Sequence, residues 1–242
     1  MKRILITGAT SGIGLSVAKH FLKKNLVVYC LGRNFKELDF FVKEKNLKKN
    51  YRKYKIDFNK KFSFKDFKNI ESLDKILISS GFVKNNLIKF FDETAFDSML
   101  TVNLLNPVKL ISYLYTNNKV NSKAQIVFLS SLLGHSKLMP GTSAYSISKA
   151  GMISAMRSYA LELSEKEITI NALAPGMVDT PLVKNASYIS KKQFEADRQR
   201  YLIGKKYLSI NEVKKQILYL LSSSSRKITG QTLVIDAGFG LK

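Results

Sequence analysis

Short apolar runs of strand length alternate along the chain with longer segments in which apolar residues recur at helical spacing. This alternation predicts a parallel sheet whose strands are joined by crossover helices. The expected strands are Arg3–Thr7, Leu26–Leu31, Tyr51–Ile56, Lys75–Ser79, Gln125–Leu129, Thr169–Ala174 and Thr232–Ile235. The expected helices are Gly12–Lys24, Phe35–Glu44, Phe64–Ile70, Phe96–Tyr115, Ser143–Ser164 and Asn211–Ser222, with a charged, less regular segment at Leu182–Lys206.

The pattern predicts a single domain over residues 1–242. Of the 242 residues, 45% are hydrophobic and 24% are charged, and neither an internal repeat nor a linker interrupts the alternation. Because parallel crossovers are right-handed, seven such strands predict a doubly wound α/β sheet with helices on both faces. Ligands of such sheets bind at the carboxyl ends of the strands.

Composition narrows the cellular setting and the partners. Cys30, the one cysteine, lies in an apolar run, and a buried, unpaired thiol fits a reducing cytoplasm. With no apolar run of about 18 residues and no signal peptide, we expect a cytoplasmic protein without membrane association. The net charge of +22 (40 basic against 18 acidic residues) directs attention to nucleic acid, phosphorylated ligands, an acidic carrier protein or an anionic membrane. Since the excess is scattered lysine, we interpret most of it as solvated surface and do not favour nucleic acid.

The first candidate site is the glycine turn between the first strand and the first helix. At such a turn, backbone N–H groups and the positive end of the helix dipole can hold a pyrophosphate. The residues expected to bind it are Gly8, Thr10, Ser11, Gly12, Ile13 and Gly14. The second strand ends at Arg33 and Asn34, without the acid that would bind the ribose of NAD. We therefore predict that Arg33 and its neighbour hold the 2′-phosphate of NADP(H).

The second candidate site combines Tyr145 and Lys149, which share one face of a helix because they lie four residues apart. A tyrosine acting as an acid near neutrality needs its pKa lowered by about three units, or about 4 kcal/mol, and a neighbouring ammonium supplies part of this. This pair alone is a weak signal. Ser131 strengthens it because a hydroxyl at the carboxyl end of a strand can donate to a carbonyl, and Asn103 because a buried helical amide needs a specific partner.

Taken together, these motifs resemble the short-chain dehydrogenase/reductase family over nearly the whole chain. The pattern is most similar to the bacterial reductases of 3-oxoacyl groups on acyl carrier protein, and it implies a Rossmann-type domain that uses NADP(H). The residues carrying the resemblance are the glycine turn Thr7–Gly14, Asp57, Asn103, Ser130-Ser131, Tyr145 and Lys149, Ile168–Ala172, Pro175–Pro181 and Ile228–Leu233.

The resemblance also implies a role for each matching residue. Tyr145 would be the general acid, Ser131 would polarise the carbonyl, Lys149 would bind the nicotinamide ribose and lower the pKa of Tyr145, and Asn103 would hold a relay water. The further cofactor contacts implied are Asp57 at the adenine ring, then Ser80, Gly81, Tyr145, Lys149, Pro175, Gly176, Val178 and Thr180. No metal site is expected, since His20 and His135 have no second ligand at metal spacing.

Two departures from the family pattern stand out. The family usually has Asn-Asn-Ala-Gly after the fourth strand, whereas this chain has Ile78-Ser79-Ser80-Gly81, which puts the local strand geometry in doubt. The stretch from Asp57 to Ile76 is also short, so the helix within it must be abbreviated.

The expected function is an NADPH-dependent ketoreductase acting on a 3-oxoacyl thioester. The alternatives are a reductase of a keto-sugar or other small ketone, and a non-catalytic dinucleotide- or nucleic-acid-binding protein of the same fold. Specificity is expected in the loop after Ser131 and in a lid at Leu182–Lys206, whose cations would attract an acidic carrier or a negatively charged substrate. These cations are Lys184, Lys191, Lys192, Arg198, Arg200, Lys205 and Lys206, with Lys166 expected on the same side.

The resemblance implies a homotetramer. Within the sequence, the support is an apparent excess of apolar residues over one buried stripe on the helix Ser143–Ser164. These residues are Met152, Ile153, Met156, Tyr159 and Leu163.

Overall fold

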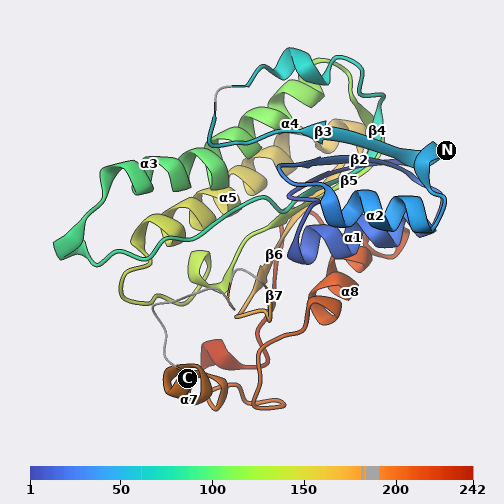
Figure 1. Ribbon diagram of the computed structural model, residues 1–242. Coiled ribbons are helices and arrows are strands. Elements are labelled where there is room, and N and C mark those ends of the chain that lie inside the picture. Colours follow the sequence, from blue (N-terminus) through green and yellow to red (C-terminus); the bar gives the residue numbers. More distant parts are fainter. Residues whose placement is uncertain (61, 181–182, 184–190, 242) are drawn as a thin grey trace.

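The computed structural model describes residues 1–60, 62–180, 183 and 191–241, which are arranged around a parallel sheet (Figure 1). The seven strands lie in the order β3-β2-β1-β4-β5-β6-β7. Their bounds are β1 Arg3–Thr7, β2 Val27–Gly32, β3 Tyr51–Lys55, β4 Leu73–Ile78, β5 Val120–Leu129, β6 Thr169–Pro175 and β7 Thr232–Ile235. The order reverses between β1 and β4, and this is the point at which a doubly wound sheet binds its ligand.

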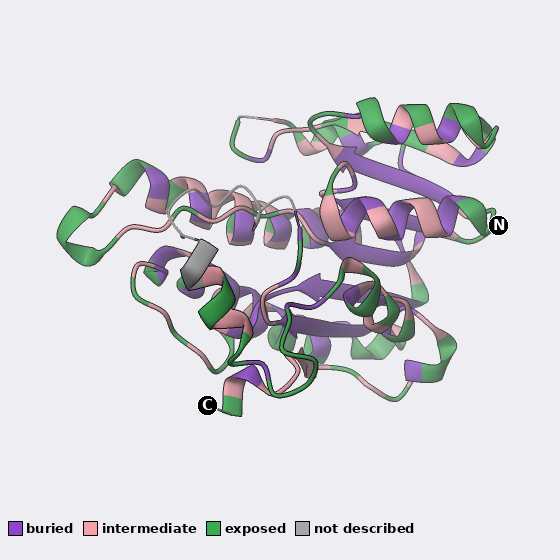
Figure 2. Ribbon diagram, turned by 60° about the horizontal axis from the view of Figure 1, so that its bottom comes forward, coloured by how far each residue is buried: buried purple, intermediate pink, exposed green. Residues whose placement is uncertain are grey.

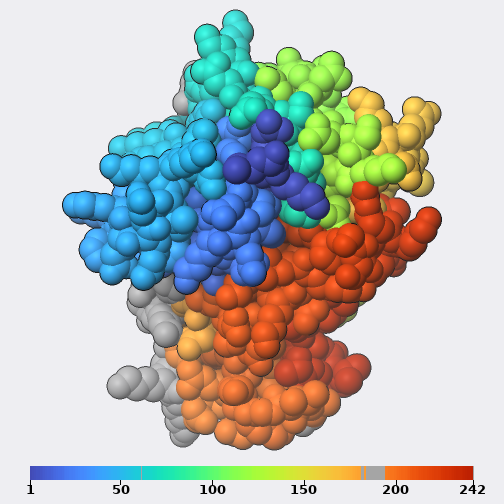
Figure 3. All heavy atoms as spheres, turned by 90° about the vertical axis from the view of Figure 1, so that its right-hand side faces the viewer, coloured from blue at the N-terminus to red at the C-terminus, as the bar shows by residue number. Residues whose placement is uncertain are grey.

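Helices cover both faces of the sheet. One face carries α1 Gly12–Lys23, α2 Lys36–Glu44 and α8 Ile210–Leu220. The other carries α4 Asn106–Thr116 and α5 Ser143–Glu162, and α3 Glu93–Leu100 packs against α5. Figure 3 shows the N-terminal segment beside the later orange-red segment, consistent with the shared core of α1 and α8. A further helix, α7 Lys191–Arg198, stands away from the sheet (Figure 1).

The core consists of two apolar layers separated by the buried sheet (Figure 2). Successive strand residues point to opposite layers, as the two-residue period of a strand requires. In β4, Ile76 and Ile78 pack under α4 and α5, whereas Leu77 packs under α1 and α8. Both layers are apolar, so the central strands lack the polar alternation of a half-exposed sheet.

The strands and most helices agree with the sequence prediction to within a few residues, but two helices differ. The helix expected at Phe64–Ile70 is only a 3₁₀ turn at Phe64–Phe67, as the short connection requires. The helix expected at Phe96–Tyr115 is interrupted by a π turn at Thr101–Leu105. Hydrophobic periodicity does not reveal a single inserted residue in a helix, which is how most π turns arise.

The apolar excess on α5 does not exist as an exposed surface. Met152 and Met156 are fully buried and Ile153 and Leu163 nearly so, all within the core of one chain. The exposed apolar residues of α5 are instead Ile147, 50% exposed, and Leu161, 79% exposed. Four of the five residues from which a tetramer was predicted therefore serve the monomer core, and the fifth, Tyr159, is half-buried against it. Among the described residues, no helix combines the length and the apolar character needed to cross a membrane.

Candidate active site

The glycine turn connects β1 to α1 and packs against the end of β4. Gly8 has φ +66° and Gly12 has φ +52°, values that glycine adopts without the steric cost of a side chain. A Cβ on Gly8 would lie 2.9 Å from the Ser79 carbonyl oxygen, and one on Gly14 would overlap the Gly8 carbonyl. The turn therefore requires glycine at these positions.

The N-terminus of α1 fits an anionic ligand. Ser11 occupies the N-cap position without a side-chain capping bond, and the first turn of α1 contains no acidic residue. No acidic side chain of this first turn thus competes for the amide groups of Gly12, Ile13 and Gly14. With the helix dipole, these amides suit the pyrophosphate of a dinucleotide.

Ser79 and Ser80, which stand where the family usually has asparagine and alanine, keep the end of β4 aligned with β1. The Thr7 hydroxyl accepts the Ser79 and Ser80 backbone N–H groups, each at 3.0 Å, and donates to the Ser80 hydroxyl at 3.1 Å. The Ser79 hydroxyl donates to the Thr7 carbonyl at 2.5 Å. Hydroxyl groups thus tie β4 to β1, and the two strands stay in register up to Thr7 and Ile78.

The carboxyl ends of β2 and β3 form the part of the site where the sequence predicts adenosine binding. Gly32 lies against the glycine turn, since a Cβ on it would come within 2.6 Å of the Thr10 hydroxyl. The exposed Arg33 follows directly. Asp57 is brought beside Gly32 because Ile56 N–H donates to the Gly32 carbonyl at 2.9 Å. The Asp57 carboxylate also accepts the Asn59 N–H at 3.0 Å, so it forms a turn of its own.

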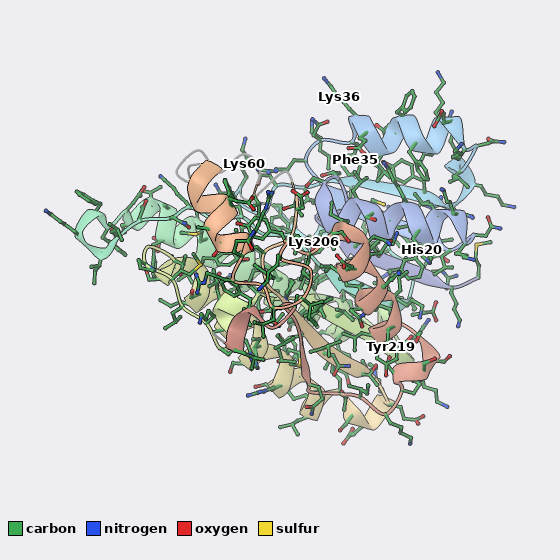
Figure 4. The ribbon with its side chains drawn as sticks, turned by 90° about the horizontal axis from the view of Figure 1, so that it is seen from below. His20, Phe35, Lys36, Lys60, Lys206 and Tyr219 are labelled. Carbon is green, nitrogen blue, oxygen red and sulfur yellow. The ribbon has the colours of Figure 1, made fainter. Side chains whose placement is uncertain are left out.

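Asn34 and Lys36 complete the surface at this end. The Asn34 side chain accepts the Lys36 N–H at 3.1 Å, opening α2, while the Lys36 side chain is exposed and directed away from the body (Figure 4). The nearest acid, Glu37, is paired with Lys19 at 2.8 Å. No acid therefore directly follows β2, as the sequence predicts.

Lys149 is the central buried cation of the site. It is 4% exposed, its Nζ donates to the Leu129 carbonyl at 2.9 Å, and it lies 5.8 Å from the Tyr145 ring centroid. Burial lowers the pKa of Lys149 to about 8, because low dielectric disfavours the charged form. The ammonium is thus placed to favour a phenolate at Tyr145.

The loop that carries Ser131 is fixed to the same turn of α5. Ser131 Oγ accepts the Leu133 N–H at 3.2 Å, a bond that does not use its own O–H. The Ser130 hydroxyl donates to the Lys149 carbonyl at 2.9 Å. A Cβ on Gly134 would lie 2.5 Å from Lys149 Cβ, so only glycine allows this approach.

Asn103 lies in the π turn, fully buried, and its amide is bonded to protein. The amide donates to the Phe82 carbonyl at 2.9 Å and to Ser148 Oγ at 3.1 Å, and it accepts the Phe82 N–H at 3.0 Å. Ser148 in turn donates to the Tyr145 carbonyl at 2.7 Å. Asn103 therefore connects the segment after β4 to the helix of Tyr145. Sequence reasoning passed over Ser148, because nothing distinguishes it from other helical serines.

Gly81 occupies the space between the two polar groups of the site. A Cβ on Gly81 would lie 3.2 Å from Asn103 Oδ1 and 3.3 Å from Lys149 Nζ. Both distances are shorter than ordinary van der Waals contact. The segment after β4 thus lies directly against the buried ammonium.

The segment after β6 returns to the glycine turn. Pro175 ends β6 and Gly176 N–H donates to the Ile235 carbonyl at 2.9 Å. Val178 forms a parallel bridge with Leu208, and Thr180 lies near Gly12, where a Cβ would be 3.8 Å from its methyl group. The described residues that are predicted to contact the two halves of the cofactor thus lie together at the carboxyl ends of the strands.

The lid region is only partly described, and its charges are mixed. Lys184 lies outside the described residues, as do the side chains of Lys191 and Lys192. Arg198 pairs with Glu195 at 3.6 Å, and Arg200 with Asp197 at 3.3 Å. A cavity of about 460 Å³ is lined by Asp179, Glu195, Arg198, Lys205, Lys206, Tyr207, Ser209 and Glu212, and Figure 4 shows Lys206 near its centre of view.

Lys166 does not belong with these cations. It precedes the amino end of β6 and lies over the Tyr115 ring at 4.7 Å, whereas the lid follows the carboxyl end of that strand. The expectation that it shares the lid's side of the fold is wrong.

Neither histidine belongs to a metal centre in the part of the chain that is described. His20 is half-buried on α1 and His135 is exposed after β5. No three His, Cys, Asp or Glu side chains gather there in a metal-binding group.

Fold and site together define an oxidoreductase of the dinucleotide-binding type, with a glycine turn at one end and a Tyr/Lys pair at the other. Residues 8–240 match the model of the short-chain dehydrogenase family described as enoyl-(acyl carrier protein) reductase. The chain belongs to the short-chain dehydrogenase/reductase family.

Named relatives resemble the chain over its whole length. It is 28% identical to the 3-oxoacyl-(acyl-carrier-protein) reductase FabG of Buchnera aphidicola subsp. Baizongia pistaciae, over 98% of this chain and 96% of the relative. Two solved structures are similar in fold: 4-hydroxyisoleucine dehydrogenase complexed with NADH (TM-score 0.88, 25% identity, all of both chains) and ElxO with NADP bound (TM-score 0.85, 27% identity, 100% of this chain and 99% of that one).

Proposed function

We propose that this protein is an NADPH-dependent ketoreductase whose substrate is a 3-oxoacyl thioester. The observation that carries the proposal is the arrangement around Lys149, whose buried ammonium lies beside Tyr145 while the Ser131 loop is fixed to the same helical turn. This arrangement suits the reduction of a carbonyl, because it combines a proton donor, a hydrogen-bond donor and a cation.

Each residue has a role in the proposed reaction. Ser131 donates its hydroxyl to the substrate carbonyl, and Tyr145 protonates the oxygen as negative charge develops on it. Lys149 favours the phenolate left on Tyr145 and binds the nicotinamide ribose. Asn103 holds the segment after β4 through its amide. A relay water would therefore bind either the second lone pair of Asn103 Oδ1 or a nearby backbone group.

The proposed cofactor is NADP(H), which supplies the hydride when bound. The amides of the glycine turn would hold its pyrophosphate, and Arg33 its 2′-phosphate. The pairing of Glu37 with Lys19 supports this preference over NAD, because the first acid after β2 already has a cationic partner. The named neighbours include one with NADP and one with NADH. The preference for NADP(H) proposed for this chain therefore rests on its own residues after β2.

The proposed substrate follows the naming of the relatives as 3-oxoacyl reductases, with a keto-sugar or other small ketone as the alternative. We propose that an acidic carrier delivers it, attracted by the net charge of +22 and by Lys205 and Lys206 at the lid cavity. We further propose a cytoplasmic homotetramer, in which exposed residues such as Ile147 and Leu161 would be covered.

A panel of substrates tests this function. NADPH oxidation is measured with acetoacetyl thioesters, on acyl carrier protein and on a neutral carrier fragment, and with keto-sugars, simple diketones and a crotonyl thioester. We expect acetoacetyl thioesters to give the highest kcat/KM, which for the carrier-bound form falls several-fold from low to high salt because screening weakens attraction beyond about 10 Å. Preference for the crotonyl thioester would instead identify an enoyl reductase and overturn the proposal.

A further inference from the structure

Tyr201 links the lid to the backbone of the segment expected at the nicotinamide. It follows α7, is fully buried, and its hydroxyl accepts the Met177 N–H at 2.8 Å. A Cβ on Gly176 would lie 3.1 Å from the same hydroxyl oxygen. The phenol thus lies directly against the backbone of residues 176 and 177.

Met177 is held on both sides of its backbone. Its N–H donates to Tyr201, and its carbonyl accepts the Leu208 N–H at 3.0 Å. The next residue, Val178, forms the bridge to Leu208. Backbone bonds to Leu208 hold Val178 on both sides, since Asp179 N–H also donates to the Leu208 carbonyl at 2.8 Å. The Tyr201 hydroxyl adds a side-chain anchor at Met177.

The Tyr201 ring is itself fixed by the C-terminal tail. Its centroid lies 4.8 Å from that of Phe239, and both rings share a small apolar cluster with Leu132, the residue after Ser131. The N–H groups of Leu202 and Ile203 donate to the Ala237 carbonyl at 3.0 and 3.2 Å. The tail thus contacts the segment that follows α7 and holds the phenol ring in place.

We propose that Tyr201 is a positioning residue for the nicotinamide half of the cofactor site. Its hydroxyl fixes Met177 and through it Val178, so that the segment is already in place when the cofactor binds. This inference rests on the proposed function, which assigns the segment after β6 to the nicotinamide. Without the hydroxyl, the half-buried Met177 N–H loses its protein partner, and the segment shifts or bears the cost of an unmade bond.

Tyr207 provides a matched control. Its ring belongs to the same cluster, 5.6 Å from Tyr201, and it is similarly buried. Its hydroxyl, however, donates to the Phe194 carbonyl at 3.5 Å, within the lid itself. Tyr207→Phe therefore removes a hydroxyl from the same cluster without touching the segment 176–178.

The test compares two ligands on the full-length protein by calorimetric titration. The first is NADPH, and the second is 2′-phosphoadenosine diphosphate ribose, which has the same adenosine end but no nicotinamide. We expect Tyr201→Phe to weaken NADPH binding about tenfold, the effect of one lost hydrogen bond, and to change binding of the ribose compound less than about twofold. Tyr207→Phe should leave both affinities close to wild type.

Three results would overturn the inference: equal loss for both ligands, equal loss in both variants, or unchanged NADPH binding by Tyr201→Phe. Failure of the wild-type protein to bind either ligand would instead overturn the proposed function. If Tyr201→Phe does not fold, Gly176→Ala displaces the same hydroxyl without removing it. It should show the same difference between the two ligands, and equal loss for both would again refute the inference.

Discussion

Replacing Asn103 with alanine should destabilise the protein as well as reduce its activity. The substitution removes three hydrogen bonds of a fully buried amide and leaves the Phe82 N–H and carbonyl without that partner. Ser148 keeps its own bond to the Tyr145 carbonyl, so it loses only an accepted bond. Two unpaired backbone groups at about 1 to 2 kcal/mol each give an expected loss of about 3 kcal/mol.

Urea unfolding of the wild type and the variant measures this loss, provided that the slope of the transition is unchanged. Asn106→Ala is the matched control, because Asn106 lies on the same helical run and makes one side-chain bond, to the Phe58 carbonyl at 2.7 Å. It should cost about 1 kcal/mol with unchanged turnover. If Asn103→Ala abolished turnover yet unfolded within about 0.5 kcal/mol of wild type, the scaffold role argued from these bonds would be wrong.

Three further predictions concern the cofactor and Lys149. Arg33→Ala should weaken NADPH binding by about 1.5 to 3 kcal/mol and leave NADH binding nearly unchanged, and equal losses would remove Arg33 from the 2′-phosphate site. In the direction of reduction, kcat/KM should fall as pH rises through about 8, the pKa to which burial lowers Lys149, because the ammonium is charged only below it. A decline seen only near the usual lysine pKa of about 10.4 would contradict this. Gly81→Ala should lower kcat about tenfold by displacing Lys149 Nζ, 3.3 Å from the added Cβ, and an unchanged kcat would show that the site tolerates the shift.

The sheet and both ends of the candidate site could be predicted from sequence because they depend on local signals. The strand β1 is bounded as expected by its apolar run and the glycines that follow. The glycine turn is recognisable because two of its residues adopt positive φ, and the Tyr145/Lys149 pair because helical spacing places both on one face.

Other features depend on tertiary packing and had no such signal. The π turn around Asn103 lies inside a run that the apolar pattern predicts as one continuous helix. Met152 and Met156 suggested an exposed interface, yet the sheet covers them. Lys75 lies in a strand as expected, but no pattern indicates that it is buried, where it bonds to Gln125 and to the carbonyl of Leu221 at the end of α8.

Tyr145→Phe tests the central claim, that Tyr145 is the proton donor of a carbonyl reduction, most directly. The substitution removes only the phenolic hydroxyl, so the variant should bind NADPH with nearly wild-type affinity. NADPH oxidation with an acetoacetyl thioester and NADPH binding are measured on the same preparations of wild type and variant. We predict turnover reduced by at least about a thousandfold, within the range attributed to general acid catalysis, with unchanged binding. A variant that kept a tenth of the wild-type turnover would contradict the claim.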